Sequence, residues 1–314
     1  MMKKFLFMAL CCLPLLAGAQ PQAVQEAASA DTVVAPRPFA VLENARLLPE
    51  ARIRAYNPVL DAAGNLLLFS DGNTGALLLY DFTRDTVLTV TRAYVAGGDA
   101  AFGGDGKVYY VTQQVGADRL VYRTGRCYDP ASHQSQAVTE PRHGVMQPVR
   151  ARQSGVIKEA GLLTQSIAAG DTAVYVDGST VHVVLDGEDR SFSPVESQAG
   201  YLWPSLSPDG TRVLFFAAGK GAVVIDLQGR VVAMLGNYEM PCWWDDSYVV
   251  AQHAEDDGHQ ITTSQLMLLK ADGSQALPLT EPSSMAMQPA SAAGRIVYST
   301  IDGVLYEMKI ELNE

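Results

Sequence analysis

Basic residues are scarce in this sequence of 314 residues: 34 acidic side chains outnumber 23 lysines and arginines, and the formal net charge is −11 at pH 7. Such a charge repels phosphate backbones and anionic lipid, which excludes nucleic acids as expected partners. Charged residues make up only 18% of the chain, whereas 48% are hydrophobic. The chain is too apolar to be disordered and can bury a large core.

Long hydrophobic runs are also lacking beyond the N-terminus. Lys3 and Lys4 precede an apolar run over residues 5–16, and Ala17-Gly18-Ala19 follow it. This pattern predicts a secretory signal peptide over residues 1–19, cleaved after Ala19. The competing interpretation, a membrane anchor, needs about 20 apolar residues. A lipid anchor needs small residues before its cysteine, but Cys11 follows Leu10.

Residues 20–38 are rich in Ala, Gln and Pro without a sustained period, which predicts a flexible linker. We therefore expect three parts: a signal peptide (1–19), a linker (20–38) and one folded domain (39–314). Cleavage would remove two lysines and change the net charge to −13. The expected location is the periplasm, the cell surface or the medium.

Cysteines are few. Two of the four lie in the predicted signal peptide, which leaves Cys127 and Cys242. Two cysteines 115 positions apart do not form a disulfide framework, although an oxidising compartment would allow them to pair. Two separate thiols are the favoured interpretation, because cysteine is commonly a small core residue.

Helical spacing of apolar residues is almost absent after residue 39. Short β-branched and aromatic runs recur instead between Gly, Asp and Asn turns, as at 65–70, 107–112, 212–217 and 295–300. Their continuous apolar character is typical of strands covered on both faces. The sequence therefore predicts an all-β fold of layered sheets.

These runs belong to an internal repeat. Six similar segments precede them, five with a proline, namely those at Pro58, Pro148, Pro204, Pro241 and Pro289, and one at 99–106 without it. The copies recur on average about every 46 residues, within the spacing of propeller blades. The third copy is about ten residues over-long around 157–171. The repeat predicts a six-bladed β-propeller.

The fourth copy is the most regular. Ser207-Pro208-Asp209-Gly210 combines a fixed φ, a side chain that bonds its own backbone and a glycine free to adopt positive φ. With Pro204 before it and 212–216 after it, this segment resembles the repeat of the TolB-like (PD40, WD40-like) β-propeller family. Val138-Thr139-Glu140-Pro141 and Leu279-Thr280-Glu281-Pro282 resemble the Leu-Thr blade ending of the family. The resemblance implies a periplasmic or surface module that binds protein partners without catalysis.

Motifs for catalysis are missing: the chain has no Gly-x-Ser-x-Gly, His-Glu-x-x-His, phosphate loop or Cys-x-x-Cys. The absence of these motifs is weak evidence against an enzyme, because propeller enzymes assemble their catalytic residues from several blades. The acidic segment 253–259 has two histidines that could ligate a metal, but a solvated hairpin loop is favoured. Glycines at 97–98 and 103–106 are interpreted as turns, and Trp243 and Trp244 as core packing between blades.

Candidate binding residues lie in the connections between blades, which share one face. They are planar or cationic, types that are enriched in recognition hot spots. The candidates are Arg54, Tyr56, Tyr94, Arg142, His143, Tyr201, Trp203 and Tyr238. The alternative is that half of them simply pack beneath the loops. We expect at least Arg54, Arg142, His143 and Tyr201 to line one concave surface.

The sequence thus predicts a monomeric, non-catalytic scaffold that binds a protein or glycan of the cell envelope, without cofactor or metal. A carbohydrate-active or hydrolytic enzyme with its site in the central funnel is the alternative, and a purely structural envelope component is a third. Two structural expectations follow. The segment 39–48 should complete the last blade, which otherwise lacks a strand and leaves an open edge. Cys127 and Cys242 should not be bridged, because they belong to different blades.

Overall fold

The computed structural model describes residues 39–48, 52–93, 95–159, 162–163, 167 and 170–313. The predicted signal peptide and linker lie outside these residues. The described chain is built from strands and one short 3-10 helix, η1 (Pro282–Ser284), so the all-β prediction is confirmed.

The strands form seven antiparallel sheets in the described residues. The first two sheets are β2 (Ala55–Leu60), β3 (Leu66–Asp71), β4 (Leu77–Asp81), β5 (Thr86–Thr91), and β6 (Val95–Phe102), β7 (Val108–Val115), β8 (Val121–Asp129), β9 (Gln134–Ala137). Two smaller sheets follow: β10 (Met146–Arg150), β11 (Gly155–Glu159), β12 (Leu162–Leu163), and β13 (Thr172–Asp177), β14 (Thr180–Leu185), β15 (Glu188–Phe192). The next two are β16 (Tyr201–Leu206), β17 (Arg212–Ala217), β18 (Gly221–Asp226), β19 (Val231–Gly236), and β20 (Glu239–Trp243), β21 (Tyr248–Asp256), β22 (Ile261–Lys270), β23 (Ala276–Pro278). The last sheet joins β24 (Ala286–Ala292), β25 (Arg295–Thr300) and β26 (Leu305–Leu312) to β1 (Phe39–Arg46).

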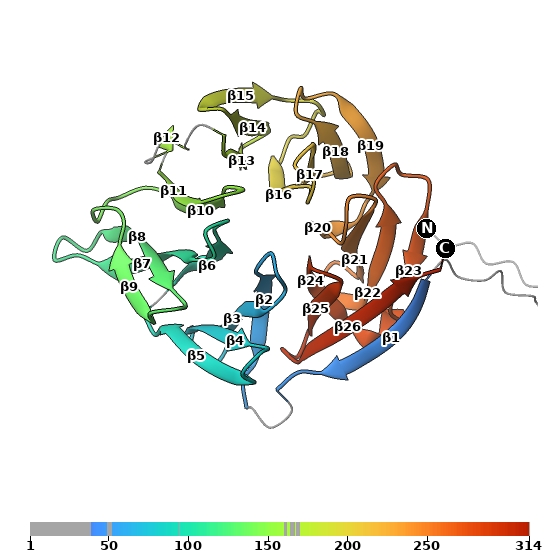
Figure 1. Cartoon of the computed structure of the whole chain (residues 1–314), viewed down its shortest axis with the longest axis horizontal. Coiled ribbons are helices and arrows are strands. Elements are labelled where there is room, and N and C mark those ends of the chain that lie inside the picture. The colour runs from blue at the N-terminus through green and yellow to red at the C-terminus, as the bar shows by residue number, and fades with distance from the viewer. Residues whose placement is uncertain are drawn as a thin grey trace, which may run out of the picture. The chain divides into compact units, whose positions relative to one another are not determined.

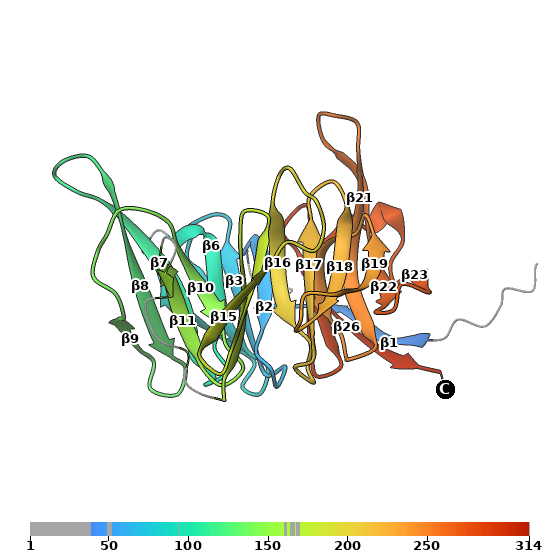
Figure 2. The ribbon, with the colours of Figure 1, turned by 90° about the horizontal axis from the view of Figure 1, so that it is seen from above.

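The sheets stand side by side in a ring, each with its first strand nearest the centre (Figure 1). Seen edge-on, the hairpins β7–β8 and β21–β22 project beyond the ring on the same face (Figure 2). This is the β-propeller that the repeat predicts.

The third repeat unit is divided. Five of the six predicted units each form one four-stranded sheet, but the third forms two three-stranded sheets, β10–β12 and β13–β15. An antiparallel bridge between Ala151 and Ala173 joins them. The third unit is longer than the average repeat, because Pro148 and Pro204 are 56 residues apart. The turns before and after β14 have only two residues each, so this length accommodates the additional strands. The propeller therefore has six sequence units, whereas its ring holds seven sheets in the described residues.

The turn of the fourth unit shows how the sequence sets a blade. Ser207 Oγ donates to Asp209 Oδ1 at 2.6 Å, and the same hydroxyl accepts the Arg212 backbone N–H at 2.9 Å. Gly210 has φ 78°, a conformation that costs glycine little. The predicted strand at 212–217 coincides with β17.

The core lies between neighbouring sheets, because both faces of each sheet are covered. Along β17, Leu214 packs toward the β20–β23 sheet, whereas Val213 and Phe215 belong to the cluster shared with β13 and β14. Trp243 and Trp244 likewise belong to two different clusters, on opposite sides of their sheet. This confirms that they pack between blades.

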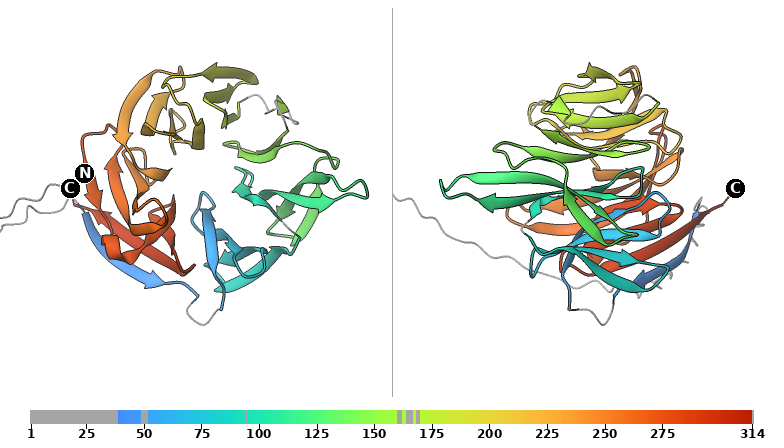
Figure 3. Two further views of the ribbon diagram at one scale, coloured as in Figure 1. Left: turned by 180° about the vertical axis from the view of Figure 1, so that it is seen from behind. Right: turned by 60° about the vertical axis from the view of Figure 1, so that its left-hand side comes forward.

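The N-terminal strand closes the ring. β1 pairs antiparallel with β26, from Phe39 opposite Leu312 to Arg46 opposite Tyr306, and the two strands lie side by side when the ring is seen from behind (Figure 3). Phe39 is 3% exposed and packs in the core between the last two sheets. The predicted closure is confirmed.

The cysteines are also as expected. Cys127 and Cys242 are both free thiols, on β8 and β20.

Candidate functional site

A central cavity of about 860 Å³ occupies the middle of the ring. Residues of all seven inner strands line it: β2, β6, β10, β13, β16, β20 and β24. The lining includes the first turn of several blades, such as Ser207-Pro208 and Asp245-Asp246. The cavity thus extends to the face that carries these turns, opposite the connections between blades.

Two guanidinium groups lie on one side of this cavity. Arg150 ends β10 and Arg152 follows it in the turn to β11. Neither side chain forms a hydrogen bond or ion pair with any residue in the described ranges. The protein around Arg150 lowers its pKa by partial desolvation although the residue is exposed, and the negative charge of Asp61 acts in the opposite direction. The Arg152 guanidinium reaches Gly210, where a Cβ would lie only 2.2 Å from Nη1.

Two carboxylates face the cavity from another sheet. Asp245 Oδ1 accepts the backbone N–H groups of Ser247 and Tyr248 at 2.6 and 2.7 Å. Asp246 Oδ1 accepts the Asp209 N–H at 2.8 Å, which links two neighbouring blades. Both acids therefore hold turns, which is a positioning role rather than that of a free acid or base.

Three polar atoms in the cavity-lining residues are buried without a partner among the described residues. They are Ser205 Oγ on β16, Trp244 Nε1 after β20 and Ser291 Oγ on β24. A buried polar group without a hydrogen bond costs about 1–3 kcal/mol, so such groups call for an explanation.

The sequence-predicted residues other than Tyr94 occupy the opposite side of the ring, near the starts of inner strands. None of them is among the residues that line the central cavity. Arg54 and Tyr56 contact the last blade: Arg54 Nε donates to the Asp302 carbonyl at 3.3 Å, and Tyr56 Oη donates to the Ile301 carbonyl at 3.2 Å. The Arg54 guanidinium also lies 5.8 Å from the Tyr56 ring centroid.

Arg142 and His143 lie together against the edge of β8. Arg142 pairs through its backbone with Arg123 and through Nη1 with Glu159 Oε2 at 3.1 Å. His143 Nδ1 is 3.0 Å from the Val121 carbonyl, and its ring lies 4.0 Å from that of Tyr122. Both side chains are exposed.

Tyr201 is not a surface residue, which corrects the prediction that it lines a concave surface with Arg54, Arg142 and His143. It is 3% exposed, its ring packs on Phe215 and its hydroxyl donates to the Val195 carbonyl. Trp203 is partly exposed beside Phe216, and the half-buried Tyr238 packs near His253. Tyr94 lies outside the described residues.

Around Arg142 and His143 the surface is unusually apolar. Val115, Leu120 and Val145 are 70%, 52% and 71% exposed, and Val121 is exposed as well. Val115 ends β7, Leu120 lies in the turn before β8, and Val145 follows Gly144, whose carbonyl accepts a hydrogen bond from Arg123 of β8. We name this area the β7–β8 patch. It comprises Val115, Leu120, Val121, Tyr122, Arg123, Arg142, His143 and Val145.

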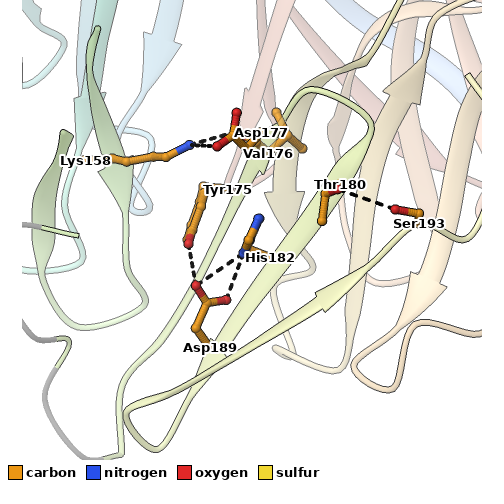
Figure 4. A network of polar contacts seen from close by, with 8 residues as sticks. All are labelled: Lys158, Tyr175, Val176, Asp177, Thr180, His182, Asp189 and Ser193. Carbon is orange, nitrogen blue, oxygen red and sulfur yellow. Dashed lines mark hydrogen bonds and ion pairs between the residues drawn. The ribbon is translucent and has the colours of Figure 1, made fainter. Parts of the chain in front are cut away.

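A second polar cluster, which the sequence did not reveal, joins the two small sheets (Figure 4). Tyr175 Oη donates to Asp189 Oδ2 at 2.5 Å, and His182 Nδ1 lies 3.0 Å from Asp189 Oδ1. Lys158 Nζ of β11 reaches Asp177 at 3.6 Å and the Val176 carbonyl at 3.3 Å in β13. The ammonium also lies 4.6 Å from the Tyr175 ring. These contacts stabilise the junction between two sheets that each have three strands within the described residues.

The segment 253–259 spans the end of β21 and the loop before β22, as the hairpin interpretation predicts. Asp257 Oδ1 accepts the His259 and Gln260 N–H groups at 2.9 Å each, a turn-forming role. No cluster of three metal-ligating side chains occurs within the described ranges. No helix in this part of the chain is long and apolar enough to cross a membrane.

Comparison with known proteins supports the architecture. No family model and no curated protein matches the sequence. Among solved structures, TolB from Acinetobacter baumannii has a TM-score of 0.52 at 16% identity over 76% of this chain, which spans 57% of that protein. Oligogalacturonate lyase from Vibrio parahaemolyticus has a TM-score of 0.54 at 13% identity, covering 86% of this chain and 96% of the lyase. The propeller domain of Cps50 (Swd1) from Myceliophteria thermophila has a TM-score of 0.58 at 9% identity, covering 87% and 99%.

At such identities the likeness shows the fold alone. The chain is a β-propeller, with the architecture also found in TolB.

Proposed function

We propose that this protein is an exported, non-catalytic binding scaffold that recognises a protein partner through the β7–β8 patch. The observation that carries the proposal is the exposure of Val115, Leu120 and Val145 beside Arg142 and His143. Apolar area bordered by arginine and aromatic side chains is typical of protein interfaces rather than of free surface. TolB-like neighbours fit a binding role, and the signal-like segment 1–19 supports export.

The outer contacts of the partner are proposed to be four further residues on the same face: Arg54, Tyr56, Trp203 and Tyr238.

Catalysis is the less favoured alternative. One structural neighbour is a lyase, but the carboxylates that face the cavity here are bonded to backbone N–H groups.

The test compares two double variants of the mature chain as baits for envelope extract. Arg142→Ser with Val145→Ser alters the patch, and Arg230→Ser with Val231→Ser removes a similar exposed pair elsewhere. We expect the patch variant to lose about tenfold or more of a partner that the wild type and the control capture. Equal capture by both variants would contradict the proposal. A captured species that survives protease treatment of the extract would identify a glycan partner instead.

A further inference from the structure

We propose that the central cavity binds a small acidic saccharide, whose single carboxylate pairs with the guanidinium of Arg150. This site lies toward the other face of the propeller and does not depend on the β7–β8 patch. Its ligand is a small molecule rather than a protein.

The first argument is the unpaired charge. Arg150 is an exposed residue of the cavity lining, and its side chain has no hydrogen bond or ion pair to any described residue. The N–H groups of this guanidinium are therefore free to bind a ligand, and a carboxylate that accepts two of them forms strong charge-assisted hydrogen bonds. Arg152 lies two residues away and adds a second positive charge.

The second argument concerns the rest of the ligand. Asp245 and Asp246 lie on the same cavity wall as Trp244, so a polyanion would be repelled there. A ligand with one carboxylate can pair with the arginines on one side of the cavity. If its other groups are polar but neutral, the aspartates on the other side do not repel it. The hydroxyls of Ser205 and Ser291 and the indole N–H of Trp244 belong to cavity-lining residues and have no partner among the described residues, although the three atoms themselves are buried.

The third argument is size. Pockets that enclose small ligands usually measure about 300–1,000 Å³, and the cavity of about 860 Å³ falls within that range. Seven inner strands, each from a different sheet, form its wall, so the site is preformed by the fold.

The test is isothermal titration of the mature chain with cellobiouronic acid, which has one carboxylate, and with cellobiose, which has the same rings without it. We expect the acid to bind about tenfold or more tightly than cellobiose, because charge-assisted hydrogen bonds are strong. Arg150→Met should weaken acid binding about tenfold or more, and Arg150→Lys by less. Arg230→Met removes the same charge from an exposed turn and should change nothing.

Three results would overturn the proposal: no binding of the acid sugar, equal affinity for the two sugars, or unchanged binding by Arg150→Met in a variant that melts like wild type. Acetyl-Gly-Gly is a further probe. If this peptide carboxylate binds through Arg150 and the sugar does not, the cavity is a peptide site instead. Loss of partner capture by the patch variant leaves these outcomes unaffected, so the two proposals fail separately.

Discussion

At the scale of single residues, the two cysteines show how burial decides reactivity. Burial raises the pKa of Cys242 to about 12 from its ordinary value of 9.0 and also raises the pKa of the buried Cys127. A thiol with a raised pKa has less thiolate at a given pH. The thiolate fraction of Cys242 near pH 8 is therefore below that of an ordinary cysteine.

We therefore predict that the folded mature protein reacts very slowly with Ellman's reagent at pH 8, whereas both thiols react promptly in 6 M guanidinium chloride. Rapid release of one equivalent from the folded protein would contradict this prediction. Absence of reaction after unfolding would indicate a disulfide and would contradict the free thiols.

Tyr201 illustrates a different residue-scale effect. The sequence places it in a connection between blades, where an aromatic side chain can serve either binding or packing. In the structure its ring packs on Phe215 and its hydroxyl bonds to Val195. Tyr201→Ala would therefore test core packing rather than recognition, because truncating a buried aromatic residue costs about 3–5 kcal/mol.

At the scale of elements, closure by β1 is the feature most open to test. We predict that Phe39→Ala lowers the free energy of unfolding by about 3–4 kcal/mol, because it empties space in a buried cluster at the seam of the ring. Leu42→Ala is the matched control on the same strand. Leu42 is 62% exposed, so its truncation should change stability by less than about 0.5 kcal/mol.

Urea unfolding monitored by tryptophan fluorescence measures both effects. If the two substitutions cost the same, the packing of Phe39 across the seam does not hold β1 in place.

The inner strands share a second element-scale feature. In four units the residue before the repeat proline has a positive φ: Asn57 54°, Trp203 52°, Met240 48° and Gln288 54°. The pairing with the second strand shifts register at the same point in each. The residue before a proline ordinarily favours extended backbone. At these four positions the contacts within the ring override the local preference for extended backbone. Between two neighbouring blades, for example, the Asn57 backbone N–H donates to Gln288 Oε1 and Gln288 Nε2 donates to Asn57 Oδ1.

At the scale of the whole molecule, turn aspartates link stability to pH. The hydroxyl of Thr83 and nearby backbone N–H groups hold the pKa of Asp81 below its ordinary value of 3.8. Hydrogen bonds from Ser274 lower that of Asp272 to about 2. A folded-state pKa below the unfolded value stabilises the fold above the unfolded pKa, and this stabilisation is lost as pH falls through the folded pKa.

We predict that the free energy of unfolding is nearly constant from pH 7 to 5 and decreases between about pH 4 and 2. Urea titrations at pH 7, 5, 4, 3 and 2 measure it. Asp81→Asn should reduce the slope in the acid range. Stability that does not change down to pH 2 would show that these turn bonds contribute little.

The sequence by itself determined the all-β class, the repeat, the tight turns and the closing strand. Each depends on local signals, such as Ser207-Pro208-Asp209-Gly210, or on a count of strands that leaves one missing. Only the tertiary structure decided that the third unit divides into two sheets and that Tyr201 is buried. It also decided that Arg150 and Trp244 line one cavity, whereas Arg142 and His143 lie at the opposite face. These outcomes depend on how strands from distant units face the axis. An alternating or continuous apolar pattern does not encode that arrangement, because both faces of every blade are buried.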